Sequence, residues 1–165
     1  MQDRDQSAKA IAALLEKKLT IAVAESLTGG LVTAELTSIP GASGTVLGGV
    51  IVYATELKNT LLGVDPELLA REGPVHPEVA RQLALGVRER IAVGGRSADI
   101  GLATTGVAGP EPQGGRAVGT VYIGISVWAK TRVVDMILSG DRESVRAQTV
   151  KRAITELCAE LGCDR

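Results

Sequence analysis

Short apolar runs rich in β-branched residues alternate along this chain with segments whose apolar side chains recur at helical spacing. Ile11, Leu14 and Leu15, for example, share one face of a helix, whereas residues 20–25 form a continuous apolar run. Continuous runs are typical of strands that helices cover on both faces. The predicted strands are 20–25, 46–54, 98–104, 118–127 and 131–138, and the predicted helices are 5–18, 31–36, 56–63, from Pro77 to near Gly94, and from a cap at Ser139 or Asp141 to residue 161.

The order of these segments predicts an α/β fold with a mainly parallel sheet and helices on both of its faces. The last two strands are close enough in sequence to form a hairpin, which gives the sheet one antiparallel strand. Residues 65–74 form a connector between Asp65-Pro66 and Gly73-Pro74. The length of 165 residues corresponds to one domain, without internal repeats or a low-complexity linker.

Charge and composition exclude several classes of protein. The chain carries 18 Lys and Arg against 19 Asp and Glu, so its net charge is -1 and no overall positive field attracts nucleic acid or an anionic membrane. Its aromatic residues are Tyr53, Tyr122 and Trp128, too few to stack single-stranded bases. Neither a membrane-spanning run nor a secretory signal is found, which predicts a cytoplasmic protein. The single histidine, His76, lacks nearby partners for a zinc site.

Two glycine-rich loops follow predicted strands, one after residue 25 and one after residue 104. Ligands of α/β sheets bind at the carboxyl ends of strands, so both loops are predicted walls of a site. In the first loop, Ser26 can present its hydroxyl to a substrate, and free amides near Thr28, Gly29 and Gly30 can bind an anion or oxyanion. The alternative is an ordinary turn in which Ser26 or Thr28 only caps the next helix.

A serine nucleophile needs a base, and the sequence offers two. His76 lies at a helix start, where an exposed histidine without a catalytic role is the simpler interpretation. Tyr53 ends a strand and Lys58 follows in the next helix, so both side chains can project toward one end of the sheet. A partly desolvated lysine there has a lowered pKa and can accept the proton of Ser26, whereas a solvated surface lysine cannot. Spacing alone does not decide between these two states.

The second loop offers hydroxyls and amides for a ribose or phosphate at Thr105, Gly106, Gly109 and Gly115, or is a flexible connector. A P-loop motif is absent, and no GxGxxG follows the first strand. These absences disfavour a nucleoside triphosphatase and a dinucleotide-binding fold.

Two arginines on the last helix are further candidates for an anion. Arg142 and Arg146 lie four residues apart on one helical face and can hold a phosphate together. The alternative is an exposed basic face that pairs with Asp141 and Glu143.

Five motifs occur along the chain in a fixed order: AESLTGG, GGVIVYATELKNTLLGV, GPVHPEVARQLALGVRER, TTGVAGP with VGTVYIGI, and LSGDRESVRAQTV. Together they closely resemble the CinA C-terminal domain family, the nicotinamide mononucleotide (NMN) amidohydrolases or NMN deamidases. The resemblance implies that residues 1–165 form a single such domain with its core at about 8–162. It also implies a three-layer α/β/α sandwich with a mixed sheet, in agreement with the order of predicted elements.

The activity that this resemblance implies is hydrolysis of the NMN carboxamide to nicotinate mononucleotide and ammonia, in pyridine-nucleotide recycling. It assigns Ser26 as nucleophile, Lys58 as base, and Tyr53 as the group that relays a proton or orients the lysine. Backbone amides of residues 28–30 or of Thr105-Gly106 would stabilise the oxyanion. No metal or cofactor is implied.

The nucleotide part of the substrate is assigned less directly. Thr105, Gly109 and Gly115 are candidates for the ribose and phosphate, and Arg142 is a further one. A homo-oligomer is expected from the resemblance alone. Two other functions stay open: a non-catalytic nucleotide- or partner-binding module of the same fold, and an amidase for another small amide.

The chain departs from the family pattern at two places. The position of His76 is commonly Ser in the family, which argues against His76 as the base. Residues 111–113, Glu-Pro-Gln, precede Gly114-Gly115, where the family runs directly into an acidic residue and glycines. Contacts made by this second loop are therefore the hardest to transfer.

Overall fold

The computed structural model describes residues 2–163, with side chains from Asp5 onward. The elements follow the predicted order, with an added helix, an added hairpin and an added 3-10 helix. They are α1 (Gln2–Lys17), β1 (Ile21–Glu25), α2 (Leu31–Thr37), β2 (Val46–Ile51), α3 (Thr55–Leu62), α4 (Pro66–Glu72), α5 (Pro77–Arg90), β3 (Ala92–Val93), β4 (Arg96–Ser97), β5 (Ile100–Gly106), β6 (Thr120–Val127), β7 (Lys130–Ile137) and α6 (Arg142–Leu161), and a short 3-10 helix covers Ala42–Gly44.

The longer strands form one sheet in the order β2-β1-β5-β6-β7. β1 is parallel to β2 and to β5, whereas β6 is antiparallel to both β5 and β7. β6 therefore runs against the other four strands, which confirms the prediction of a mainly parallel sheet with one antiparallel strand. Because β1, β2 and β5 are parallel, their carboxyl ends meet at the same edge of the sheet.

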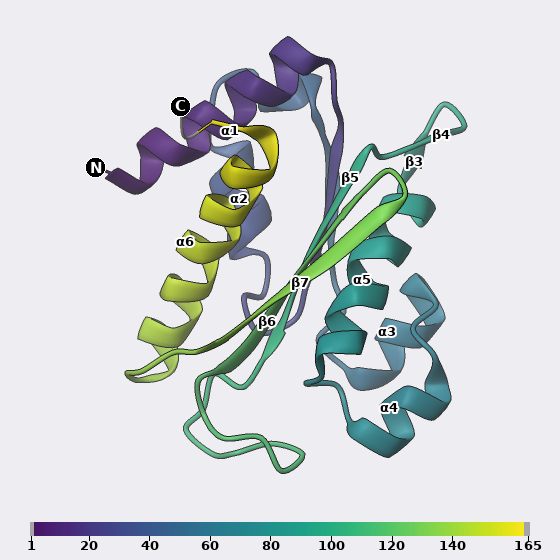
Figure 1. The fold of residues 1–165 in the computed structure, drawn as a ribbon, viewed down its shortest axis with the longest axis vertical. Helices are drawn as coiled ribbons and strands as arrows, with labels where there is room; N and C mark the ends of the chain where they lie inside the picture. The colour runs from purple at the N-terminus through teal and green to yellow at the C-terminus, as the bar shows by residue number, and fades with distance from the viewer. Residues whose placement is uncertain (1, 164–165) are drawn as a thin grey trace.

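Helices cover both faces of the sheet and complete the predicted three layers (Figure 1). α1, α2 and α6 pack on one face, and α3, α4 and α5 on the other. Side chains along β1 alternate between the two cores, with Val23 in the first and Ala22 in the second. α5 lies very close to the sheet, since a Cβ atom at Gly101 would be 2.0 Å from the carbonyl oxygen of Ala84. Such close packing suits a chain without Phe.

The first addition, α4, lies inside the segment that the sequence indicates as a connector. Asp65 accepts a hydrogen bond from the Glu67 amide at 2.9 Å, and Pro66 is the first helical residue. The Asp-Pro pair therefore caps a short helix rather than forming a loop.

The second addition is the small β3–β4 hairpin. Its turn is Gly94-Gly95, both with positive φ, where the sequence predicts the end of the preceding helix. That helix, α5, ends earlier, because Ile91 adopts an extended conformation. A two-residue glycine turn is typical of a hairpin, so the same glycines fit both interpretations.

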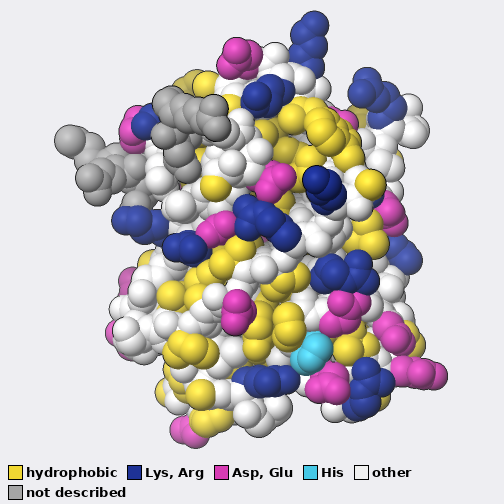
Figure 2. Space-filling view, viewed as in Figure 1, with side chains coloured by type: hydrophobic (Ala, Val, Ile, Leu, Met, Phe, Trp, Pro, Cys, Tyr) yellow, Lys and Arg dark blue, Asp and Glu magenta, His cyan; other side chains and the backbone are white. Residues whose placement is uncertain are grey.

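The surface carries both signs of charge. On the face shown in Figure 2, basic and acidic side chains are interspersed with apolar ones. This distribution agrees with the net charge of -1. Within residues 2–163, no helix combines the length and the apolar composition needed to cross a bilayer.

Candidate active site

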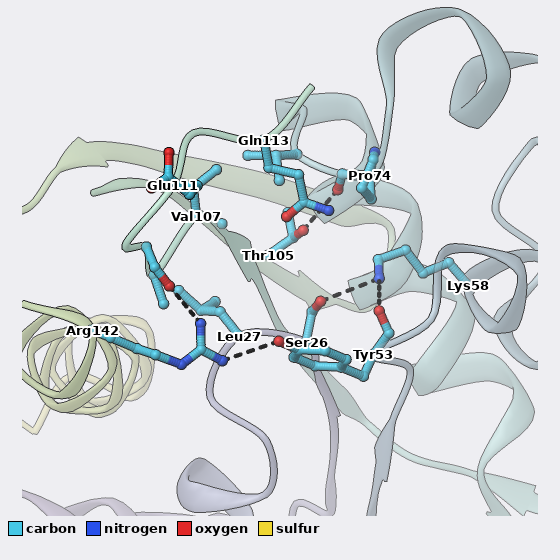
Figure 3. A pocket seen from close by; sticks show the side chains of 14 residues that line it. Ser26, Leu27, Tyr53, Lys58, Pro74, Thr105, Val107, Glu111, Gln113 and Arg142 are labelled. Atoms are coloured by element: carbon cyan, nitrogen blue, oxygen red, sulfur yellow. Dashed lines mark hydrogen bonds between the residues drawn. The ribbon is translucent and has the colours of Figure 1, made fainter. Parts of the chain in front are cut away.

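A pocket lies at the edge of the sheet where β1, β2 and β5 end, next to the loop that follows β5 and to the first turn of α6 (Figure 3). This is the place where α/β sheets bind ligands. Its volume is about 110 Å³, below the roughly 300–1,000 Å³ of a pocket for a drug-sized ligand, so it suits the reactive end of a substrate. The lining residues are Ser26, Leu27, Tyr53, Lys58, Pro74, Val75, Thr105, Gly106, Val107, Ala108, Gly109, Glu111, Gln113 and Arg142.

The structure brings the predicted nucleophile and the predicted base together. Ser26 directly follows β1, and Lys58 lies in the second turn of α3, which follows β2. The Nζ atom of Lys58 donates to the Oγ atom of Ser26 at 3.2 Å, although 32 positions separate them in the sequence. Both side chains are buried. The pair thus has the contact that a hydroxyl nucleophile and its base require.

Lys58 is held by neutral partners. Its side chain is 1% exposed, and its Nζ atom also donates to the carbonyl oxygens of Val52 at 2.6 Å and Tyr53 at 3.4 Å. Burial removes water from the ammonium form and lowers the pKa of Lys58 from 10.5 to about 8. A sizeable fraction of the amine is therefore neutral near pH 8 and able to accept a proton.

The loop between β1 and α2 is fixed by the side chain of Glu25. This fully buried carboxylate accepts hydrogen bonds from the backbone amides of Gly30 at 2.9 Å, Val32 at 3.1 Å and Thr33 at 2.8 Å. The Thr33 hydroxyl donates to it as well, at 2.7 Å. The carboxylate thus occupies the N-terminus of α2, where an anionic ligand would otherwise find free donors.

Three residues of the first loop that the sequence proposes as ligand contacts lie outside the pocket lining. The amide of Gly29 donates to the Ser26 carbonyl oxygen at 3.1 Å, and the amide of Gly30 is held by Glu25. Thr28 is fully buried, with its hydroxyl 2.8 Å from that of Thr104. The segment 28–30 therefore shapes the turn that follows Ser26, and its residues do not line the pocket.

The two arginines of α6 have different roles. Arg146 turns toward the Ser26 loop, where its Nε atom donates to the Leu27 carbonyl oxygen at 2.9 Å and its Nη2 atom to that of Thr28 at 3.1 Å. Arg142 lies on the pocket rim instead. The two arginines share a helix face, but their guanidinium groups bind different parts of the molecule. These contacts do not support a phosphate site formed by both.

Tyr53 meets Arg142 at the rim. The Nη2 atom of Arg142 donates to the Tyr53 hydroxyl at 3.1 Å, and its Nη1 atom donates to the Gly109 carbonyl oxygen at 2.8 Å. The Tyr53 side chain is 59% exposed, and its hydroxyl points toward Arg142 while its backbone carbonyl contacts Lys58 (Figure 3). Tyr53 thus contacts Lys58 through its main-chain carbonyl, while its hydroxyl accepts a hydrogen bond from Arg142.

The loop after β5 supplies the opposite wall. Thr105, Gly106 and Gly109 line the pocket, and the Thr105 hydroxyl donates to the Pro74 carbonyl oxygen at 2.7 Å. Gly115 lies outside the lining. It forms the turn of a small bridge between Gln113 and Arg116.

Sequence reasoning missed several lining residues. Glu111 and Gln113 reach the pocket from this same loop, and Pro74 and Val75 from the segment between α4 and α5. For Glu111 and Gln113, the one sequence signal is the unusual Glu-Pro-Gln stretch at 111–113, where the chain departs from the family pattern. Nothing in the pattern around Pro74 indicates a site.

His76 serves as a helix cap. Its Nδ1 atom accepts a hydrogen bond from the Glu78 amide at 3.1 Å, which starts α5. It lies outside the pocket lining, as the non-catalytic interpretation predicts. Among the described residues, no three His, Cys, Asp or Glu side chains are grouped so that they could hold a metal ion.

Comparison with known proteins supports a relationship along almost the whole chain. Residues 3–161 match the family described as CinA C-terminal domain. A CinA-like protein of Frankia casuarinae is 47% identical over 141 residues, which cover 86% of this chain and 31% of that protein. A putative competence-damage inducible protein of Geobacillus sp. strain WCH70 is 49% identical over 155 residues, or 93% of this chain and 36% of that protein. The chain thus spans about a third of the length of these relatives.

Solved structures show the same fold. The crystal structure of a competence-damaged protein (CinA) superfamily protein from Enterobacter cloacae superposes with a TM-score of 0.89 at 31% identity, over 96% of this chain and 92% of that one. A competence/damage inducible protein from Agrobacterium tumefaciens superposes with a TM-score of 0.88 at 30% identity, over 98% and 96%. The α/β architecture is therefore shared with these structures.

Proposed function

The chain belongs to the CinA C-terminal domain family, and we propose that it hydrolyses the carboxamide of NMN to nicotinate mononucleotide and ammonia. The observation that carries this proposal is the contact between the Lys58 amine and the Ser26 hydroxyl, 3.2 Å apart and buried at the end of the sheet. A lysine whose pKa is lowered by burial can activate a serine without a histidine.

The reaction proceeds by acyl transfer. The Ser26 oxygen attacks the carboxamide carbon while neutral Lys58 takes the hydroxyl proton. The tetrahedral intermediate collapses when Lys58 returns that proton to the amide nitrogen, which leaves as ammonia. Water then attacks the acyl-enzyme, again with Lys58 as base, and releases the acid and Ser26. These steps use only side chains, backbone and water.

The oxyanion donor we assign is the backbone amide of Leu27, which lines the pocket, because Thr28 is fully buried outside the lining. The next two amides, of Gly29 and Gly30, are already engaged by Ser26 and Glu25. Neither the Leu27 nor the Thr28 amide has a hydrogen-bond acceptor within residues 2–163. A donor of this kind contributes typically about 3 kcal/mol to transition-state stabilisation.

The nucleotide part of the substrate extends out of the pocket. A volume of about 110 Å³ suits the carboxamide and its ring, so the ribose and phosphate lie at the rim. Arg142 is the cation at that rim, and its guanidinium group is exposed. We assign the phosphate to Arg142 because the alternative anion site, the N-terminus of α2, is taken by Glu25. Cytoplasmic location and a homo-oligomeric state remain predictions.

Release of ammonia from NMN by purified protein tests the proposal. Ser26→Ala and Lys58→Ala should each lose nearly all activity, whereas Ser38→Ala and Lys17→Ala, at exposed positions, should keep it. Full activity in either of the first two variants would reject the role assigned to that residue.

Substrate comparison separates the remaining alternatives. NMN should be hydrolysed faster than nicotinamide riboside, and nicotinamide slowest, because each step removes contacts at the rim. An amidase for another small amide would show no preference for the phosphate. A non-catalytic module would bind NMN without releasing ammonia.

A further inference from the structure

We propose that Arg146 is a positioning residue that orients and polarises the Leu27 amide of the oxyanion site, and this inference rests on the proposed function. Arg146 does not line the pocket. Its guanidinium group donates to the carbonyl oxygens of Leu27 and Thr28, in the turn formed by residues 26–30 (the Ser26 turn). Its role is thus distinct from that of Arg142, which lies at the rim.

The hydrogen bonds of the turn form two chains that start at Arg146. In the first, the Nε atom of Arg146 donates to the Leu27 carbonyl oxygen at 2.9 Å. That carbonyl belongs to the same peptide group as the Thr28 amide, and the two point in opposite directions because the peptide bond is trans. The first chain therefore ends at the unengaged Thr28 amide.

The second chain is one peptide longer. The Nη2 atom of Arg146 donates to the Thr28 carbonyl oxygen at 3.1 Å, whose peptide partner is the Gly29 amide. That amide donates to the Ser26 carbonyl oxygen at 3.1 Å, whose peptide partner is the Leu27 amide. The second chain therefore ends at the unengaged Leu27 amide, beside the nucleophile.

Both chains have the polarity that an oxyanion needs. The positive guanidinium lies at the carbonyl ends of these peptide groups, so their N–H ends face away from it. Accepting a hydrogen bond at the carbonyl strengthens the amide of the same peptide group as a donor, by about 10–30% per bond. Arg146 thus makes the Leu27 amide, which lines the pocket, a better donor to developing negative charge.

Glu25 holds the other end of the same turn. Its carboxylate binds the amides of Gly30, Val32 and Thr33, so the chain after the turn is fixed to the end of β1. Arg146 thus holds the carbonyl groups of the turn, and Glu25 holds the backbone amides of the residues that follow it. With both ends held, the direction of the Leu27 amide is set before substrate arrives, which is the condition for electrostatic catalysis.

The test compares Arg146→Lys and Arg146→Gln with wild type and with Arg152→Gln. Arg152 is a matched control, because it lies on the same helix and is exposed, in an ion pair with Glu156 at 2.8 Å. Arg146→Gln should lower kcat for NMN by roughly 10- to 100-fold with KM changed less than about threefold, since the lost interaction acts in the transition state. Arg146→Lys should recover part of the rate, and Arg152→Gln should match wild type.

Two further measurements separate positioning from simple loss of structure. The pH at which the rate is half-maximal should stay at the wild-type value, because Lys58 is untouched. The melting temperature of Arg146→Gln should lie well above the assay temperature. An unchanged kcat, or a change confined to KM, would overturn the inference.

A fluorophosphonate probe keeps this inference distinct from the proposed function. Such a probe phosphonylates an activated serine, and its phosphoryl oxygen occupies the oxyanion site. Labelling of Ser26, followed by mass spectrometry, should slow at least about tenfold in Arg146→Gln. If wild type is labelled but releases no ammonia from NMN, the proposed function fails while the inference stands. Equal labelling of wild type and variant, or none in either, would overturn the inference.

Discussion

The rate of NMN hydrolysis should rise about tenfold between pH 6 and pH 7, about fivefold between pH 7 and pH 8, and then level off, because only the neutral amine of Lys58 can accept the proton of Ser26. The lysine is buried among carbonyl groups and a hydroxyl, and desolvation lowers its pKa from 10.5 to about 8. The titration of this one group should therefore control kcat/KM.

The expected size of the effect follows from these two values. At pH 7 roughly one amine in eleven is neutral when the pKa is about 8, against roughly one in 3,000 when it is 10.5. Burial thus increases the active fraction at pH 7 by roughly 300-fold. Between pH 7 and pH 8 the neutral fraction rises from about a tenth to one half.

Initial rates of ammonia release at low NMN concentration, from pH 6 to pH 9.5, measure this titration in the free enzyme. Lys58→Arg is the matched variant, because its guanidinium keeps the positive charge but does not lose a proton, and it should be inactive at every pH. A profile that stays flat across this range, or an active Lys58→Arg variant, would refute the assignment. A pH dependence that disappears in His76→Gln would identify the histidine as the base instead.

Three further predictions concern stability and the pocket rim. The folded-state pKa of Lys58 lies below its ordinary value, so the unfolded chain holds more protons than the folded chain between pH 8 and 10.5. The free energy of unfolding of wild type should therefore rise by about 3 kcal/mol, relative to that of Lys58→Met, as the pH rises through this interval. Urea denaturation of both proteins measures the rise, and a difference that stays constant with pH would contradict the prediction. Glu25→Gln should lower the free energy of unfolding by about 1–3 kcal/mol, since buried amide donors lose acceptors, while exposed Glu16→Gln should leave the melting temperature unchanged. Arg142→Ala should raise KM for NMN roughly tenfold or more but change that for nicotinamide riboside little, because only NMN carries the phosphate; equal effects on both would exclude a phosphate contact.

The fold could be predicted from the sequence because its signals are local. Continuous apolar runs and helical spacing each depend on a few neighbouring residues, and their order determined the class of sheet. The exceptions are also local. Asp65-Pro66 is compatible with a loop and with a helix cap, and Gly94-Gly95 with a helix end and with a hairpin turn.

The site could be predicted only in part, because burial and contact are properties of the folded chain. The sequence places Ser26 and Lys58 after neighbouring strands, but it gives neither the 3.2 Å contact nor the desolvation of the lysine. Spacing also puts Arg142 and Arg146 on one helical face. What distinguishes them is that the Ser26 turn packs against the second arginine alone.

The role of Glu25 is hidden from sequence reasoning for a related reason. Helix caps are sought at the residue next to the helix, and here that residue is Gly30, which has no side chain to offer. The carboxylate that caps α2 comes from the last residue of β1, five positions earlier. Only the turn at Ser26 brings it there.

The Ser26–Lys58 pair and the loop that lines the opposite wall of the pocket are attached to different parts of the molecule. Val52 donates to the Glu25 carbonyl at 2.8 Å and accepts from Lys58 at 2.6 Å, so serine and lysine are joined through the backbone of adjacent strands. Glu111 and Gln113 come from the loop beyond β5. That loop can therefore be lengthened, shortened or rewritten, which changes what the pocket admits, without disturbing the contact between Ser26 and Lys58.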